Sequence, residues 1–251
     1  MAEVDVNADL GEDFGHYRLA HDDAILAYVT SANLACGLHA GDPVVMARSV
    51  GLAKARGVAV GAHPGYPDLQ GFGRRDMALR EDEIYAFVLY QMGALAAFCR
   101  AHGVRLHHVK PHGALYNRAA VDRAAARGIC RAIADFDPSL KVYAPYRSEL
   151  ARQAEALGLC ACSEVFADRR YEADGQLTPR QHPDAVIRDP DEACEQVLLM
   201  VQEGRVRART GEWLEVAADT ICLHGDGPQA VQLAKTLHER LTQAGVRLRP
   251  A

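Results

Sequence analysis

The chain has 251 residues, 49% of them hydrophobic, so it can bury a core large enough for one α/β domain or two small ones. Its 28 basic and 33 acidic residues give a net charge of -5, which argues against a nucleic-acid partner. We expect no membrane span, because no apolar run approaches the roughly 20 residues that cross a bilayer. The acidic start lacks the features of a secretory signal. Seven scattered cysteines are typical of a reduced protein, so we predict a cytoplasmic location.

Short β-like runs alternate with helical runs along the whole chain. Strands are predicted at 3–8, 31–36, 58–62, 104–109, 140–144, 159–163 and 219–223, with a candidate eighth at 213–216. Helices are predicted at 21–29, 43–56, 81–102, 119–136, 147–157, 191–203 and 229–244. This alternation predicts a parallel sheet with right-handed crossovers. No long linker divides the chain, so we predict a single domain, residues 1–251. Its fold would be a distorted, seven-stranded (β/α) barrel, with an open doubly wound sheet as the alternative.

Acids or histidines next to glycine follow five of the predicted strands. These motifs are Asp9-Leu10-Gly11-Glu12, His39-Ala40-Gly41-Asp42, His63-Pro64-Gly65, His112-Gly113 and His224-Gly225-Asp226. One such histidine could equally cap a helix or bind a loop carbonyl, but four at corresponding positions indicate a shared site. The carboxyl ends of barrel strands meet on one face, so we expect these side chains to line one cleft. The remaining histidines are interpreted as surface or structural: His16, His21, His102, His107, His182 and His238.

The stretch 109–117 is the richest of these strand ends, since Lys110, His112, Tyr116 and Asn117 offer four polar chemistries. Lys110 directly follows an apolar strand and is the strongest candidate for binding an anion. The start of the predicted helix at 229 could also receive one. Neither the Walker A pattern nor the G-x-S-x-G elbow is present, so any nucleotide chemistry uses another arrangement. Five arginines could add an anion-binding rim, although each alone is better explained as a solvated charge: Arg74, Arg75, Arg169, Arg170 and Arg180.

Taken together, these motifs resemble the LamB/YcsF family. The matching stretches are 7–12, 33–43, 61–68, 71–75, 109–117, 164–171 and 224–226, which run from the first strand to the last. One departure is Leu38, where the family more often has phenylalanine. The variant at 177–180 is similarly small. Neither departure touches the polar groups.

The resemblance implies a barrel similar to the glycoside hydrolase/deacetylase superfamily. It implies a hydrolase of a cyclic amide C–N bond, which opens 5-oxo-L-proline to L-glutamate while ATP becomes ADP and phosphate. It further implies ATP with Mg²⁺ as cofactor, and partner subunits B and C of a 5-oxoprolinase.

For that reaction we assign catalytic roles to four residues. Asp9 would position or activate water, His63 or His112 would donate a proton, and Lys110 would stabilise an anion. The candidates for binding substrate or anion are Asn7, Glu12, His39, Asp42, Tyr116, Asn117, Glu164, Asp168, Arg169, His224, Gly225 and Asp226.

Two alternatives stay open. The first is a metal-dependent, deacetylase-like amide hydrolase in which Asp9, His39 and His63 hold a divalent metal at the barrel mouth. One acid and two histidines form an acceptable ligand set, although their spacing is not diagnostic. The second is a non-catalytic subunit that binds the substrate and presents it to a catalytic partner.

Overall fold

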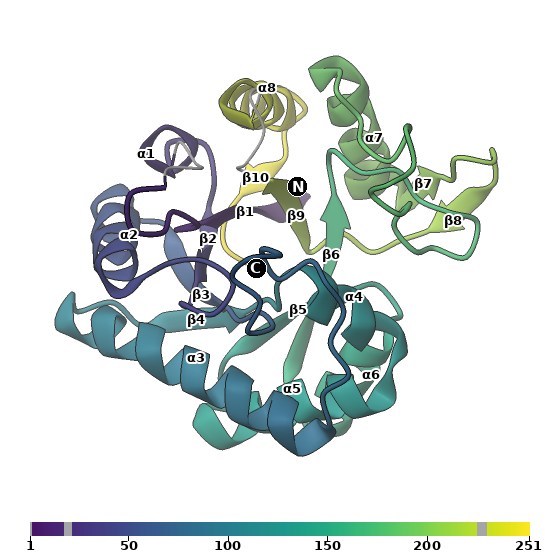
Figure 1. The fold of residues 1–251 in the computed structure, drawn as a ribbon. Helices are drawn as coiled ribbons and strands as arrows, with labels where there is room; N and C mark the ends of the chain where they lie inside the picture. The colour runs from purple at the N-terminus through teal and green to yellow at the C-terminus, as the bar shows by residue number, and fades with distance from the viewer. Residues whose placement is uncertain (1, 18–21, 225–229) are drawn as a thin grey trace.

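A closed parallel barrel forms the body of the protein (Figure 1). The computed structural model describes residues 2–17, 22–224 and 230–251. Every neighbouring pair of barrel strands is parallel, and the last strand pairs with the first, which closes the barrel. The predicted seven-stranded barrel is confirmed, and the open sheet is wrong. The barrel strands are β1 (Glu3–Leu10), β2 (Ser31–Ala35), β3 (Ala59–His63), β4 (Leu106–Val109), β5 (Lys141–Pro145), β6 (Cys160–Phe166) and β9 (Thr220–His224).

Helices surround the barrel, and their ends follow ordinary capping chemistry. Asp42 accepts hydrogen bonds from the backbone nitrogens of Val44 and Val45 at 2.7 and 3.0 Å, so it caps the helix at 43–56 as its sequence predicts. That helix ends at Gly57, whose φ of 67° suits glycine. The helices are α1 (Asp22–Ile25), α2 (Pro43–Arg56), α3 (Glu81–Ala101), α4 (Gly113–Val121), α5 (Arg123–Phe136), α6 (Glu149–Ala156), α7 (Pro190–Glu203) and α8 (Ala230–Gln243).

The single helix predicted at 119–136 is wrong, because the structure contains two helices, α4 and α5. Asp122 has an extended backbone and accepts hydrogen bonds from the nitrogens of Ala124 and Ala125, so it caps a new helix. The break is hard to see in an alanine-rich run that favours helix on both sides. Since α4 begins at Gly113, Tyr116 and Asn117 lie on a helix rather than in a loop.

The candidate eighth strand does not join the barrel. It is β8 (Trp213–Glu215), which pairs antiparallel with β7 (Arg205–Arg207) in a separate hairpin. Figure 1 shows this hairpin and α7 in green, to one side of the barrel. The strand that does extend the sheet is β10 (Arg247–Leu248), which adds in parallel to the outer edge of β1.

One helix bears on our expectation about membrane spans. By length and composition α3 is apolar enough to cross a membrane, and it is the one such helix in the described part of the chain. It lies in the outer helical layer, where it packs against α2 and α5.

The interior of the barrel is polar. Along β1 the apolar residues pack outward into the core, while Asp5, Asn7 and Asp9 alternate with them. Asp5 accepts hydrogen bonds from Tyr143 at 2.9 Å and Thr220 at 2.6 Å. Tyr143 lies on β5, which is not a neighbour of β1, so this contact crosses the barrel. Hydrogen bonds between remote strands therefore hold the interior together.

Candidate active site at the barrel mouth

The carboxyl ends of the strands open into a cleft of about 850 Å³. All four catalytic candidates, Asp9, His63, Lys110 and His112, line it, and each is at most 7% exposed. Glu12, Tyr116, Asn117, Glu164 and Arg169 also line the cleft. The structure thus brings these predicted residues together on one face, while their roles remain predictions.

Lys110 compensates two carboxylates at the floor of the cleft. Its Nζ lies 2.9 Å from Asp9 Oδ1 and 2.9 Å from Glu164 Oε1. It also lies 2.9 Å from the thiol of Cys222. Burial alone would lower the pKa of Lys110, but Asp9, Cys222 and Glu164 outweigh burial and raise the pKa well above its ordinary value. Lys110 is therefore a charged ammonium that contacts both carboxyl groups.

Tyr116 extends this network from α4. Its hydroxyl donates to Glu164 Oε2 at 2.6 Å, and Asn7 donates to Glu164 Oε1 at 3.0 Å. Burial, and then the charge of Glu164, raise the pKa of Tyr116 well above its ordinary value. Tyr116 is therefore a hydrogen-bond donor at neutral pH, held in place by a buried carboxylate.

Backbone carbonyls fix the orientation of two imidazoles. His63 Nδ1 lies 2.7 Å from the carbonyl oxygen of Lys110, and His112 Nε2 lies 2.8 Å from that of Phe72. A carbonyl only accepts, so each of these nitrogens carries the proton. His63 Nε2 and His112 Nδ1 then face each other at 2.9 Å. In two neutral rings both would be lone pairs, so the arrangement requires a shared proton or a cation.

His39 and Glu12 complete the cluster. The ring of His39 stacks on that of His112, with centroids 3.7 Å apart and planes 5° apart. Glu12 Oε1 lies 3.7 Å from His39 Nε2 and 3.5 Å from His112 Nδ1. Across residues 2–17, 22–224 and 230–251, neither nitrogen of the fully buried His39 has a hydrogen-bond partner. Leaving such a buried polar group unsatisfied costs on the order of 1–3 kcal/mol.

The charges of these imidazoles are set mainly by burial. Burial, followed by His112 and His63, lowers the pKa of His39 well below its ordinary value. Burial and then His63 lower the pKa of His112 in the same direction. Both rings are therefore neutral at pH 7, and neutral imidazole is the form that binds metal ions.

Glu12, His39, His63 and His112 form a buried group that could hold a metal ion. One ligand atom from each lies within 4.8 Å of all the others. Three imidazoles and one carboxylate suit zinc or a similar divalent ion. The carbonyls on the outer nitrogens of His63 and His112 are typical partners behind metal-binding histidines.

Asp9 was predicted as a metal ligand but lies beside this group. Its Oδ2 is 3.4 Å from His63 Nε2, while its Oδ1 accepts from Lys110 and, at 2.8 Å, from Asn33. The set that the structure brings together therefore has Glu12 and His112 in addition to the predicted His39 and His63.

Several other predicted residues lie away from the cleft or outside the described residues. Asp42 caps α2 and accepts from the nitrogen of Gly15 at 2.6 Å, so its observed role is structural. Asn7 lies in the barrel interior, and Asp168 is not among the residues that line the cleft. His224 ends β9 opposite Asp9 in the sheet register. Gly225 and Asp226 lie outside the described residues.

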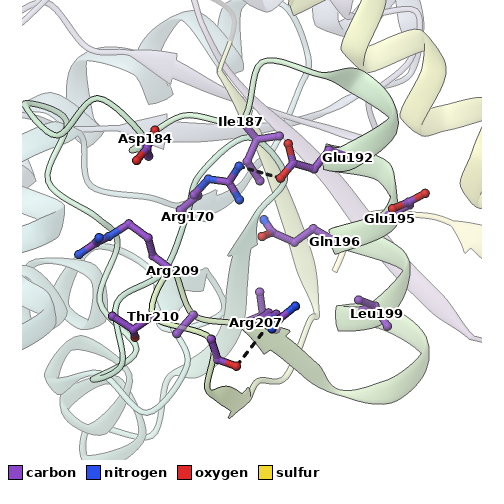
Figure 2. A pocket seen from close by; sticks show the side chains of 13 residues that line it. Arg170, Asp184, Ile187, Glu192, Glu195, Gln196, Leu199, Arg207, Arg209 and Thr210 are labelled. Atoms are coloured by element: carbon purple, nitrogen blue, oxygen red, sulfur yellow. Dashed lines mark hydrogen bonds and ion pairs between the residues drawn. The ribbon is translucent and has the colours of Figure 1, made fainter.

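The arginines of the predicted rim separate into two groups. Arg75 forms an ion pair with Asp68. Arg170 binds Glu192 at 2.7 Å in a second cavity of about 680 Å³ (Figure 2). Arg74, Arg169 and Arg180 line the cleft at the barrel mouth.

The sequence did not lead us to the residues inside the barrel that contact the site residues. His108 Nε2 lies 2.6 Å from Asn33 Oδ1, and Asn33 donates to Asn7 at 2.6 Å. Cys222, on β9, contacts Lys110. The alternation of side chains along a strand could have identified them, because every second residue points to the same face. Polar residues recur with this spacing at 5, 7 and 9, at 31 and 33, and at 220 and 222.

Comparison with known proteins gives these residues a family context. The model of the LamB/YcsF family matches residues 4–251, which confirms the predicted resemblance. The A subunit of 5-oxoprolinase from Geobacillus kaustophilus is 56% identical, with 98% of this chain and 96% of that protein covered. A Bacillus subtilis protein of the same name is 51% identical, covering 98% and 96%. The crystal structure of a lactam utilization protein from Thermus thermophilus has a TM-score of 0.95 and 50% identity, covering 99% and 100%.

More distant structures share the architecture. A polysaccharide deacetylase from Bacillus cereus is 12% identical, with a TM-score of 0.53 over 100% of this chain and 92% of that one. At this identity the likeness shows the fold alone.

Proposed function

Since the chain belongs to the LamB/YcsF family, we propose that it is the A subunit of an ATP-dependent 5-oxoprolinase. In this proposal it opens the cyclic amide of 5-oxo-L-proline to L-glutamate, with ATP converted to ADP and phosphate. The subunits B and C are its proposed partners, because the relatives are named as one subunit of an enzyme. The observation that carries the chemistry is the carboxylate of Asp9, 3.4 Å from the imidazole of His63 at the floor of the cleft.

The reaction explains why ATP is needed. A lactam carbonyl is stabilised by resonance and is a poor target for water. Phosphorylation of its oxygen, with Mg²⁺-bound ATP as donor, makes the carbon electrophilic and turns that oxygen into a leaving group. Water then adds to the carbon, the C–N bond breaks as the nitrogen takes up a proton, and an acyl phosphate remains. A second water hydrolyses this acyl phosphate and releases phosphate and L-glutamate.

The residues at the mouth suit these demands. Lys110 Nζ lies 2.9 Å from Asp9 Oδ1, and we assign to Asp9 the role of accepting the proton of the attacking water. His63 is oriented by the carbonyl of Lys110, and its Nε2 lies 2.9 Å from His112 Nδ1. A proton shared between these two nitrogens would be the one delivered to the departing nitrogen. The anion-stabilising role first assigned to Lys110 is less favoured, because its charge already faces two carboxylates.

The direct test is formation of glutamate by the assembled subunits, in the presence of ATP and 5-oxo-L-proline. Asp9→Asn should lower turnover on the order of 10²- to 10⁴-fold, because a positioned base is lost. Asp135→Asn is the matched control, since Asp135 lies exposed on α5 and bonds Tyr85. A fall of less than about tenfold for Asp9→Asn would refute its assignment. An isolated chain that binds 5-oxo-L-proline, combined with full activity of Asp9→Asn, would favour the non-catalytic alternative.

A metal-dependent amide hydrolase is the second candidate, and His39 is the observation that favours it. Glu12, His39, His63 and His112 would hold the ion, and neither nitrogen of His39 has a hydrogen bond to lose within the described residues. A divalent ion at this position would supply Lewis-acid chemistry or an acidified water. Loss of glutamate formation after chelation, restored by zinc or manganese, would support this candidate. Full activity of metal-free protein would exclude it.

A further inference from the structure

Arg169 is a buried guanidinium that forms no ion pair with a carboxylate in the part of the chain that the structure describes. Only 6% of the residue is exposed, although it lines the cleft. Its Nη2 donates to the carbonyl of Thr178 at 2.6 Å and its Nε to that of Ala185 at 3.3 Å. Among the described residues these carbonyls are its only side-chain partners. They orient the guanidinium but leave its positive charge uncompensated by an ion pair.

A second guanidinium faces the same space. Arg180 lines the cleft, is exposed, and forms no ion pair with any described residue. Burial, and next the charge of Arg180, lower the pKa of Arg169 to about 10, and the nearby charge of Asp168 offsets this only in part. Two guanidinium groups that line one cleft can present paired N–H donors to the oxygens of an anion.

The second cavity provides a contrast within the same part of the chain. There Arg170 binds Glu192 at 2.7 Å, and Arg209 binds Glu172 through two nitrogens at 3.0 and 3.1 Å. Figure 2 shows Arg170 and Glu192 joined across that cavity. Arg170 and Arg209 are therefore each paired with a carboxylate. Arg169, one residue earlier in the chain than Arg170, has no such partner among the described residues.

We propose that Arg169 and Arg180 form the subsite that binds the carboxylate of the lactam substrate. This inference rests on the proposed function and deepens it, because it makes the cleft selective for lactams that carry a carboxylate. A guanidinium fork matches the two oxygens of a carboxylate. Phe166 and Tyr171 line the cleft beside Arg169 and offer apolar surface to the ring methylenes.

A phosphate offers similar oxygens, so the two ligands must be separated. The second negative charge of a phosphate would enter a cleft that already contains Asp9, Glu12 and Glu164. A carboxylate adds only one charge, and we therefore assign the subsite to the carboxylate.

Calorimetric titration of the purified chain tests this assignment with two lactams, 5-oxo-L-proline and the uncharged 2-pyrrolidinone. We expect wild-type protein to bind 5-oxo-L-proline at least about tenfold more tightly. Arg169→Gln should weaken binding of 5-oxo-L-proline on the order of 10- to 100-fold and leave 2-pyrrolidinone unchanged. Arg180→Gln should weaken it about two- to fivefold, because an exposed charge pair is screened by water. Arg170→Gln is the matched control and should stay within about twofold.

Several outcomes would overturn the inference. These are absence of binding of 5-oxo-L-proline to wild-type protein, equal binding of both lactams, an equal loss of both in Arg169→Gln, or tighter Arg169-dependent binding of inorganic phosphate. Arg180→Gln keeps the test valid if Arg169→Gln unfolds, because Arg180 bonds no described residue. The glutamate assay separates the two proposals. Selective binding without turnover by the assembled subunits would refute the function and keep the subsite, whereas turnover with unchanged binding in both variants would refute the subsite alone.

Discussion

His108 lies inside the barrel and His39 at its mouth, and both side chains are fully buried. His108 contacts Asn33 at 2.6 Å and stacks on Tyr143 with ring centroids 4.0 Å apart. His39 also has a stacked neighbour, but in the described structure its two nitrogens lack hydrogen bonds. The same residue type is therefore hydrogen bonded by the protein in one region and lacks a hydrogen bond from the described residues in the other.

The contrast extends to the charged residues of the two regions. In the interior, Asp5 accepts from Ser31 at 2.8 Å as well as from Tyr143 and Thr220. At the mouth, Arg169 has backbone carbonyls but no acid among its described partners. Buried polar groups are normally hydrogen bonded, so a buried group at the mouth that lacks a partner among the described residues is a candidate for binding a ligand.

The largest loss of stability is expected for a substitution of Lys110, which lies where the barrel interior meets the mouth. Lys110→Met should lower the free energy of unfolding by about 3–5 kcal/mol at pH 8, because two buried carboxylates lose their cation. At least one of Asp9 and Glu164 would then have a folded-state pKa above its unfolded value. The loss should therefore be smaller at pH 5, and grow as pH rises through the raised pKa.

Urea unfolding at both pH values measures this effect. Lys54→Met is the control, because Lys54 is exposed and its ammonium donates to the carbonyl of His102. An equal loss at pH 5 and pH 8 would show that the carboxylates are not the reason.

Substitutions of His39 and His108 test the comparison between the barrel mouth and its interior. His108→Leu should cost about 2 kcal/mol of unfolding free energy, because it leaves Asn33 Oδ1 without this partner. His39→Leu should change the metal-free protein by less than about 1 kcal/mol, since no described hydrogen bond is lost. Thermal unfolding and elemental analysis of both variants provide the readouts, with bound metal lost only in His39→Leu. Equal destabilisation by the two substitutions would remove the distinction between interior and mouth.

The smallest change in stability is expected at the start of α5, which lies outside both the barrel interior and the mouth. Asp122→Ala should lower the free energy of unfolding by about 1 kcal/mol, because it removes the cap that starts α5. Asp23→Ala, which breaks an exposed pair with Arg56 at 2.9 Å, should change it by less than about 0.5 kcal/mol. Chemical denaturation of the two variants measures this difference in the free energy of unfolding. Equal values would mean that Asp122 does not cap a separate helix.

Local patterns in the sequence account for much of the fold. Hydrophobic runs bounded by glycine predicted the seven barrel strands, and the capping pair Asp42 and Pro43 predicted the start of α2. The polar strand ends predicted which residues meet at the mouth, since barrel closure brings equivalent positions together. The break at Asp122 escaped notice because helix propensity is high on both sides, and a cap is a weaker local signal.

By itself, the sequence determined the order of the elements, the barrel and the set of polar groups at its rim. Tertiary structure alone decided which of these groups find partners. Glu12 and His112 join His39 and His63, Lys110 turns to Asp9 and Glu164, and Arg169 finds only carbonyls. The physical reason is that element type depends on neighbours along the chain, whereas the partner of a buried charge depends on ångström-scale distances between strands remote in sequence.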